Sequence, residues 1–211
     1  MEALVAIGYL IGAYLIGSLP FAYLIARVAS GADLRRVGAG TVSGTGVART
    51  SGFWPMAVAG IMDIAKGAAA VLPMADDHPL LAAFGAGAVA AGHNWSIFLR
   101  GEGGRAISAS LGSTLVLAWP GTVVLSLGLA VGRLFRHTGL GSFISQAALP
   151  GVLAATHGEV GAALGGALVV PMWLKRLLGN GRPRRERPKV YLSRLLFDND
   201  EGLGSPGGGT D

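Results

Sequence analysis

Long apolar runs, interrupted only by short polar connections, most strongly limit how this chain can fold. Residues 4–28 form the first run, which carries no charge before Arg27. A run of about 25 residues is ample for a transmembrane helix, because about 20 residues cross the hydrocarbon core. It is also too long for the apolar part of a signal peptide and lacks the basic start of one. Residues 17–20, Gly-Ser-Leu-Pro, predict a kink or break within it.

Six further apolar runs follow, and together they predict the fold class. The charged fraction is 14%, against about 25% in a typical globular domain, and the 35 glycines suit closely packed membrane helices. We therefore predict an all-α integral membrane protein with about seven transmembrane helices. The later runs are residues 53–74, 80–99, 107–117, 122–134, 141–156 and 160–174.

The distribution of basic residues predicts how these helices are oriented. Of 17 lysines and arginines, only Lys66 lies well inside a predicted span, and the others lie at the ends of, or after, the first, third, fifth and seventh spans. Basic connections stay on the cytoplasmic side of a membrane. We therefore expect an N-terminus outside the cell, a cytoplasmic C-terminus and location in the cell membrane.

Composition also excludes several classes of function. The net charge is +5, but the basic residues are spread between apolar runs and do not form one soluble patch, so we expect no nucleic-acid partner. The chain has no cysteine, and His78, His137 and His157 are scattered among predicted turns. We therefore expect no metal and no other cofactor. The sequence leaves the oligomeric state open.

The region beyond the last span differs from the rest. We predict a polytopic membrane domain over residues 1–178 and a basic, partly disordered cytoplasmic tail over residues 179–211. Residues 182–189 are strongly basic, which favours contact with anionic lipid. Residues 191–197 predict a short interfacial helix, and residues 202–211, rich in glycine and serine, predict disorder.

Asp63 and Lys66 stand out because both lie inside a predicted span. They are three residues apart and so share one face of a helix. A lone charge near the bilayer centre costs about 2.5–3.5 kcal/mol on insertion scales, so the two residues are expected to pair or to line an aqueous pocket. A structural ion pair and a contribution to an anion-binding pocket both remain open.

The stretch from His93 to Arg105 is the most promising place for chemistry. The ordinary pKa of histidine suits proton transfer at neutral pH, although a hydrogen bond from His93 to a neighbouring helix is the plainer alternative. Asn94 points about 100° away from it around a helix, so the two share a site only if the helix ends there.

A glycine-rich basic turn completes this stretch. We expect the backbone N–H groups of Gly101, Gly103 and Gly104 to face an anion, with Arg100 and Arg105 supplying positive charge beside them. An ordinary flexible turn is the alternative.

Four segments in order resemble the bacterial acyl-phosphate-dependent glycerol-3-phosphate acyltransferase family. Residues 17–27, GSLPFAYLIAR, resemble the end of its first span, and residues 33–38, DLRRVG, resemble the entry to its first motif. Residues 63–67, DIAKG, match its Asp-x-x-Lys-Gly pattern. Residues 92–105, GHNWSIFLRGEGGR, resemble its Gly-His motif followed by Gly-Gly and a basic residue.

This resemblance implies an enzyme of phospholipid biosynthesis. The family transfers a fatty acyl group from acyl phosphate to glycerol 3-phosphate and yields lysophosphatidic acid, with its active face cytoplasmic and membrane lipids around it. It implies a catalytic role for His93 and Asn94. It also implies a set of residues that bind substrate or phosphate: Gly38, Gly40, Thr45, Arg49, Lys66, Arg100, Gly103, Gly104 and Arg105.

The chain departs from the family pattern in its first and last motifs. Ala39, Thr41 and Gly46 stand where the family has a serine and two asparagines, and the C-terminal motif survives only as residues 176–178, Arg-Leu-Leu. These losses define an alternative, a catalytically silent relative that binds a phosphorylated lipid precursor or supports a membrane complex. A small transporter is a weaker third possibility, because no pair of broken spans related by inverted symmetry is evident.

Overall fold

The computed structural model describes residues 3–38, 40–180 and 188–198, and within these ranges the chain forms helices joined by loops, with no strand. This confirms the all-α prediction. Three short 3₁₀ turns lie at Leu34–Arg36, Leu72–Met74 and Ile97–Leu99. The α-helices are α1 (Ala3–Ser18), α2 (Phe21–Ser30), α3 (Gly44–Ser51), α4 (Phe53–Val71), α5 (Pro79–Asn94), α6 (Ile107–Leu117), α7 (Trp119–Leu134), α8 (Thr138–Leu178) and α9 (Pro188–Phe197).

The first apolar run is broken where the sequence predicts a break. Helix α1 ends at Ser18, and α2 begins at Phe21 after the non-helical Pro20. Proline has no N–H group and its ring clashes with the preceding turn, so a continuous helix is interrupted here. The interruption leaves the carbonyl of Leu19 available to a side chain from another helix, and it accepts a hydrogen bond from Lys66 of α4.

Helix α8 contains a second break, which turns it into a hairpin. His157 and Gly158 have non-helical backbone angles, and Gly158 adopts φ 57° and ψ −136°. A Cβ on Gly161 would collide with the carbonyl of Leu153, so the two halves of α8 pack closely just beyond the turn. The turn lies within the connection that the sequence predicts between residues 156 and 160.

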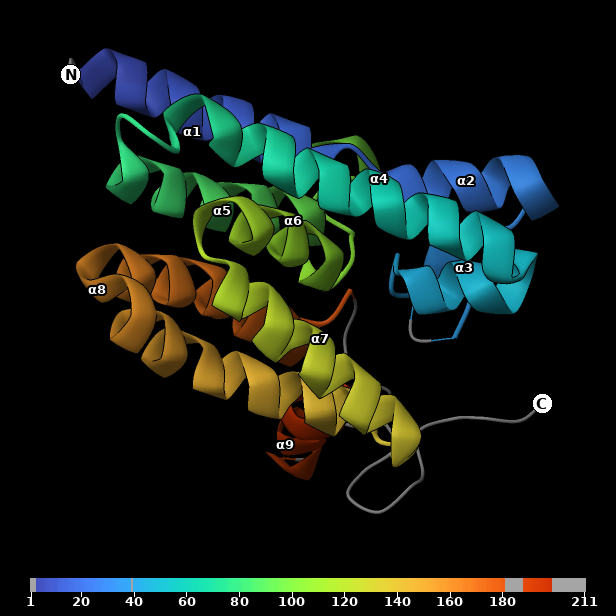
Figure 1. Cartoon of the computed structure of the whole chain (residues 1–211). Helices are drawn as coiled ribbons and strands as arrows, with labels where there is room; N and C mark the ends of the chain where they lie inside the picture. Colours follow the sequence, from blue (N-terminus) through green and yellow to red (C-terminus); the bar gives the residue numbers. More distant parts are fainter. Residues whose placement is uncertain (1–2, 39, 181–187, 199–211) are drawn as a thin grey trace.

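The helices stack in layers, with α5 at the centre (Figure 1). Helix α1 packs on α5, α4 packs on α6, and α8 packs on both α5 and α7. Small residues allow this close approach: a Cβ on Gly17 would collide with the backbone of Val89, and one on Gly67 with that of Ala109. The inward-facing side chains of α5 are small as well, and these are fully buried: Ala82, Ala83, Ala86, Val89 and Ala90.

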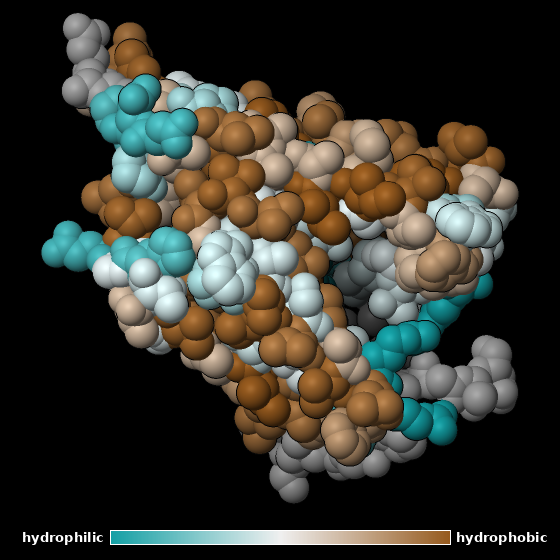
Figure 2. Space-filling model, in the orientation of Figure 1, coloured by the Kyte–Doolittle hydropathy of each residue, from teal (hydrophilic) through white to brown (hydrophobic). Residues whose placement is uncertain are grey.

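The outer surface is that of a membrane protein. Large apolar side chains face outward, as on α1, where Leu4 is 78% exposed and Ile11 is 56% exposed. Figure 2 shows hydrophobic residues across the middle of the molecule and hydrophilic residues gathered towards its ends. Among the described residues, three helical segments are long and apolar enough to cross a bilayer: Ala3–Ser30, Phe53–Met74 and Thr138–Leu178. So large an exposed apolar surface indicates contact with lipid.

The short C-terminal helix α9 packs against the end of α8. The guanidinium of Arg176 donates to the carbonyls of Gly139 and Leu195, and that of Arg194 donates to the carbonyls of Leu177 and Leu178. The carbonyls of Leu177, Leu178 and Leu195 lie in the last turns of α8 and α9, where a helix end leaves carbonyls unpaired. The short helix predicted over residues 191–197 is therefore present, whereas the disorder predicted for residues 202–211 lies outside the described residues.

Candidate active site

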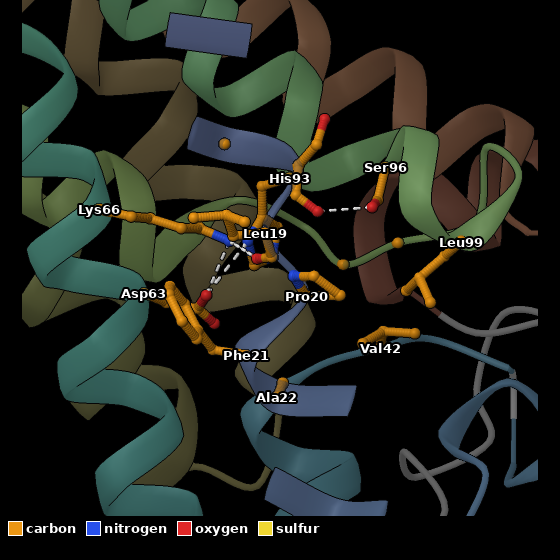
Figure 3. A pocket seen from close by; sticks show the side chains of 14 residues that line it. Leu19, Pro20, Phe21, Ala22, Val42, Asp63, Lys66, His93, Ser96 and Leu99 are labelled. Atoms are coloured by element: carbon orange, nitrogen blue, oxygen red, sulfur yellow. Dashed lines mark hydrogen bonds and ion pairs between the residues drawn. The ribbon is translucent and has the colours of Figure 1, made fainter. Parts of the chain in front are cut away.

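The break between α1 and α2 forms one wall of a narrow polar pocket. Residues 17–22 line this wall, and α4 contributes Asp63 and Lys66 from the opposite side. Figure 3 shows these side chains converging with His93, which comes from the last turn of α5. The turn that follows α5 closes the pocket through Gly103 and Gly104.

Asp63 and Lys66 form a buried ion pair on one face of α4. The Lys66 ammonium lies 2.8 Å from Asp63 Oδ1, and the two side chains are only 3% and 6% exposed. The ammonium also donates to the carbonyl of Leu19 at 2.8 Å, so it joins α4 to the helix break. A buried charge needs partners of this kind, because desolvation otherwise costs several kcal/mol. The two residues are thus an ion pair and part of the pocket wall at once.

His93 lies directly beside this pair. Its Nδ1 is 3.7 Å from Asp63 Oδ1, and only 9% of its side chain is exposed. The separation is longer than a hydrogen bond, and Nδ1 has no hydrogen-bond partner among the described residues. The other ring nitrogen, Nε2, lies over Gly104, where any side chain would collide with the imidazole. Glycine is therefore required at position 104 for the ring to occupy this place.

Asn94 points away from the pocket. Its side chain is fully buried, and Nδ2 donates to the carbonyl of Pro171 at 2.8 Å. Successive residues of a helix point about 100° apart, so His93 and Asn94 face different neighbours although α5 ends at Asn94. In this structure, Asn94 holds the end of α5 against α8.

The amide groups of the glycine-rich turn are already used inside the protein. The N–H of Gly101 donates to the carbonyl of Ser96, that of Gly103 to Asn180 Oδ1, and that of Gly104 to the carbonyl of His93. The prediction that these three amides face an anion is therefore wrong, because the turn satisfies its own donors. Gly103 and Gly104 contribute to the pocket through their lack of a side chain, which lets the backbone approach His93.

The two arginines of this stretch lie outside the pocket lining. Arg105 pairs with Asp198 at 2.7 Å and donates to the carbonyl of Lys175 at 2.9 Å, so it joins the turn to the C-terminal part of the chain. Arg100 is exposed in a left-handed backbone conformation at φ 57°. The structure therefore places positive charge around the turn but directs neither guanidinium into the pocket.

The remaining predicted residues lie on the loop before α3 and on α3 itself. Gly40 adopts φ 68°, and a Cβ there would lie 2.9 Å from the carbonyl of Arg35. Thr45 and Arg49 are exposed on α3, and a Cβ on Gly38 would lie 3.5 Å from Arg49 Nη1. Of all the predicted site residues, the pocket lining contains Lys66, His93, Gly103 and Gly104, and the others lie outside this lining.

An ion pair fixes the start of this loop. Arg35 binds Asp33 through two nitrogens, at 2.9 and 2.8 Å, and also lies 3.6 Å from Glu102 in the glycine-rich turn. Hydrogen bonding to Arg35 lowers the pKa of Asp33 to about 2. The same interaction raises the pKa of Arg35 above its ordinary value. The pair therefore keeps both charges at physiological pH and connects the loop to the turn.

Several contributors to the site were missed by the sequence interpretation. Asp63 was predicted as a partner of Lys66, and the structure adds that its carboxylate lies beside His93. The N-terminus of α2 also faces the pocket, and a helix N-terminus carries partial positive charge. The break predicted at residues 17–20 was the available signal for it. Nothing in the sequence pattern pointed to Ser96, which donates to the carbonyl of Ser18, or to Asn180.

Membrane-type helices thus enclose a pocket in which a histidine adjoins a buried carboxylate and a buried ammonium, which defines an integral membrane protein with an enzyme-like polar site. Residues 7–179 match the family model for glycerol-3-phosphate acyltransferase. The chain belongs to the glycerol-3-phosphate acyltransferase family.

Individual relatives agree with this assignment. The chain is 38% identical over 169 residues to glycerol-3-phosphate acyltransferase 5 of Dehalococcoides mccartyi, which covers 75% of this chain and 69% of that protein. It is 37% identical over 185 residues to the glycerol-3-phosphate acyltransferase of Synechococcus sp. (strain CC9902). That match covers 81% of this chain and 90% of that protein.

A solved structure shares the fold. The crystal structure of PlsY, an integral membrane glycerol 3-phosphate acyltransferase, in its glycerol 3-phosphate form, superimposes with a TM-score of 0.69 at 23% identity. The match covers 84% of this chain and 94% of that one.

Proposed function

We propose that this protein transfers a fatty acyl group from acyl phosphate to the 1-hydroxyl of glycerol 3-phosphate and so produces lysophosphatidic acid for phospholipid biosynthesis. Membership of the glycerol-3-phosphate acyltransferase family supports the reaction. The observation that carries the proposal is the buried cluster of His93, Asp63 and Lys66 at the helix break.

His93 acts as the general base in this proposal. The hydroxyl oxygen of glycerol 3-phosphate attacks the acyl carbonyl carbon, its proton passes to Nε2 of His93, and the bond from that carbon to the phosphate oxygen breaks. Inorganic phosphate leaves with the bonding electrons. Asp63, 3.7 Å from Nδ1, stabilises the imidazolium that forms. General base catalysis of this kind contributes about 10²–10⁴-fold to the rate.

Positive charge for the phosphate groups comes from two places at the pocket. Lys66 supplies a buried ammonium, and α2 directs its N-terminus toward the same space. Helix N-termini favour bound phosphate. Outside the pocket lining, Arg49 on α3, beside Gly38, adds a guanidinium that suits a phosphate group.

The surrounding predicted residues have supporting roles in this proposal. Gly38, Gly40 and Thr45 shape the loop and the first turn of α3, and Arg100 adds exposed positive charge in the turn that follows α5. Arg105 and Asn94 act through the backbone segments that they hold in place.

We also propose about seven transmembrane spans, an outside N-terminus, a cytoplasmic active face and location in the cell membrane. The alternation of basic and non-basic connections supports this arrangement. The wild-type chain has no cysteine, so single cysteines report on topology directly. In intact cells, a membrane-impermeant thiol reagent should label Asp77→Cys and Glu159→Cys but not Arg136→Cys; the reverse pattern would contradict the orientation.

We retain the division into a membrane domain over residues 1–178 and a cytoplasmic tail over residues 179–211 as a proposal. The family match, which ends at residue 179, supports the boundary. Contacts between α9 and α8 support a tail whose helix α9 packs against the membrane domain.

An acyl-transfer assay distinguishes the proposed enzyme from the catalytically silent alternative. Purified protein supplied with acyl phosphate and glycerol 3-phosphate should release inorganic phosphate and form lysophosphatidic acid. A folded protein that binds glycerol 3-phosphate but forms no product would support the silent relative instead. The intact cluster around His93 favours the enzyme, even though Thr41 and Gly46 replace the family's amide side chains.

A further inference from the structure

One side chain beyond the end of α8 joins the two loops that border the pocket. Asn180 Nδ2 donates to the carbonyl of Gly40 at 2.7 Å and to that of Gly103 at 2.9 Å, while Oδ1 accepts from the N–H of Gly103 at 3.2 Å. Gly179 precedes it at φ 63°, a conformation that ends the helix and redirects the chain. All three hydrogen bonds reach segments that are distant in sequence.

The backbone that Asn180 holds leads directly to His93. The carbonyl of Gly103 also accepts from the N–H of Val42 at 3.1 Å, which binds the two loops to each other. The N–H of Gly104 donates to the carbonyl of His93 at 3.1 Å, and Gly104 lies under the imidazole. A shift of Gly103 would therefore move the surface against which His93 packs.

The end of α8 contacts the same turn a second time. Lys175 Nζ lies 3.4 Å from the carbonyl of Gly101 and 5.3 Å from the centre of the Trp95 ring. Lys175 of α8 thus contacts the beginning of the turn at Gly101 and its end at Arg105. Asn180, beyond the end of α8, also reaches the loop that contains Gly40.

We infer that Asn180 is a positioning residue of this active site: its amide locks the Gly40 loop to the Gly103 turn and thereby sets the place of His93 and of bound glycerol 3-phosphate. The inference rests on the proposed function. A primary amide is the side-chain group suited to the task, because it donates two hydrogen bonds and accepts others at one position. It supplies an amide from a distant part of the sequence to a region in which Thr41 of the loop and Gly46 of α3 carry none.

Three substitutions test the role through kinetics. Asn180→Ala removes all three bonds and should lower kcat/KM for glycerol 3-phosphate by about tenfold or more, because displaced catalytic groups lose rate steeply. Asn180→Asp keeps the acceptor but faces two carbonyl oxygens with a carboxylate, so it should be more impaired than Asn180→Ala at pH 8. Its activity relative to wild type should recover as the pH falls, since a protonated carboxyl donates again. Asn180→Gln should retain more activity than Asn180→Ala.

A second measurement does not depend on turnover. Hydrogen–deuterium exchange of the detergent-solubilised full chain should accelerate in peptides covering residues 40–43 and 101–104 of Asn180→Ala, while the transmembrane core stays protected. Leu178→Ala, two residues earlier and at an exposed side chain, is the matched control and should leave both loops and the kinetics unchanged.

The outcomes separate this inference from the proposed function. Unchanged exchange in both loops, or a kcat/KM for Asn180→Ala equal to that of wild type, would overturn the positioning role. A wild-type protein that makes no product would contradict the proposed function. The exchange comparison and glycerol 3-phosphate binding by Asn180→Ala would still decide whether Asn180 organises the site.

Discussion

Asp63 Oδ1 forms an ion pair with the ammonium of Lys66 at 2.8 Å within a buried stretch of α4, and the same carboxylate oxygen lies 3.7 Å from Nδ1 of His93. The carboxylate of Asp63 therefore neutralises the buried ammonium of Lys66 and also lies beside the proposed base. Pairing alone would account for the burial of the two charges in α4. Their position beside His93 and at the break between α1 and α2 makes them part of the wall of the polar pocket.

Breaking this pair should cost stability and activity separately. Asp63→Asn leaves the buried charge of Lys66 without its partner, and Lys66→Met does the same to the charge of Asp63. Removing one member of a buried ion pair typically lowers the free energy of unfolding by about 3–5 kcal/mol. The double variant Asp63→Leu with Lys66→Met replaces the pair with apolar groups and should unfold at a higher temperature than either single variant. It should nevertheless remain inactive. Thermal unfolding in detergent and product formation measure the two effects, and a double variant less stable than both singles would contradict this account.

The space beneath His93 should tolerate no side chain. Gly104→Ala places a Cβ against the imidazole and 2.6 Å from the carbonyl of Val42. The displacement should lower kcat/KM by about 100-fold, as catalytic misplacement of about 1 Å does. Gly60→Ala in α4, where a Cβ meets nothing within 4 Å, is the control and should keep full activity. Equal activities of the two variants would show that His93 does not depend on this contact.

Hydrophobic patterning predicted the architecture of the described residues well because the membrane requires it. Apolar run lengths indicated the helices, residues 17–20 indicated the break before α2, and the connection after residue 156 indicated the hairpin turn within α8. The run lengths follow from the thickness of the membrane, and the breaks follow from proline and glycine backbone chemistry that acts locally along the chain.

The site was only partly predictable, because it depends on contacts between distant segments. Residue types identified His93 and Lys66, but spacing alone did not reveal that Asn94 turns toward Pro171 or that Arg105 pairs with Asp198. The glycine turn was misinterpreted for a related reason. Its amide groups bind the carbonyls of Ser96 and His93 within the same stretch, and Oδ1 of Asn180, which only the folded chain brings near.

The packing of α4 against α6 should depend on small residues. A Cβ on Gly112 would collide with the carbonyl of Ile64, so Gly112→Leu should force the two helices apart and lower the unfolding temperature markedly. Overpacking of this kind typically costs about 1–3 kcal/mol or more. Gly12→Leu on α1, where a Cβ meets nothing within 4 Å, should fold normally. Similar unfolding temperatures for both variants would contradict the close approach of α4 and α6.

The ion pair between Asp33 and Arg35 predicts how the loop responds to pH. The pKa of Asp33 lies at about 2, below its ordinary value of 3.8. A carboxyl group whose pKa is lowered by folding stabilises the fold at any pH above its ordinary pKa. This contribution is lost as the pH falls from about 4 through about 2. The contact should therefore be constant from pH 5 to pH 8. Arg35→Gln should move the Asp33 titration, followed by carbon NMR, back toward its ordinary value; an unchanged titration would refute the assignment of Arg35 as the cause.

The most direct test compares two histidine variants in one acyl-transfer assay. Wild-type protein and His137→Ala, whose substitution lies at an exposed position away from the pocket, should convert acyl phosphate and glycerol 3-phosphate to lysophosphatidic acid. His93→Ala should remain folded, with a rate lower by about 10²–10⁴-fold, the usual range for loss of a general base. Product formation by His93→Ala at the wild-type rate would contradict the assignment of His93 as the base.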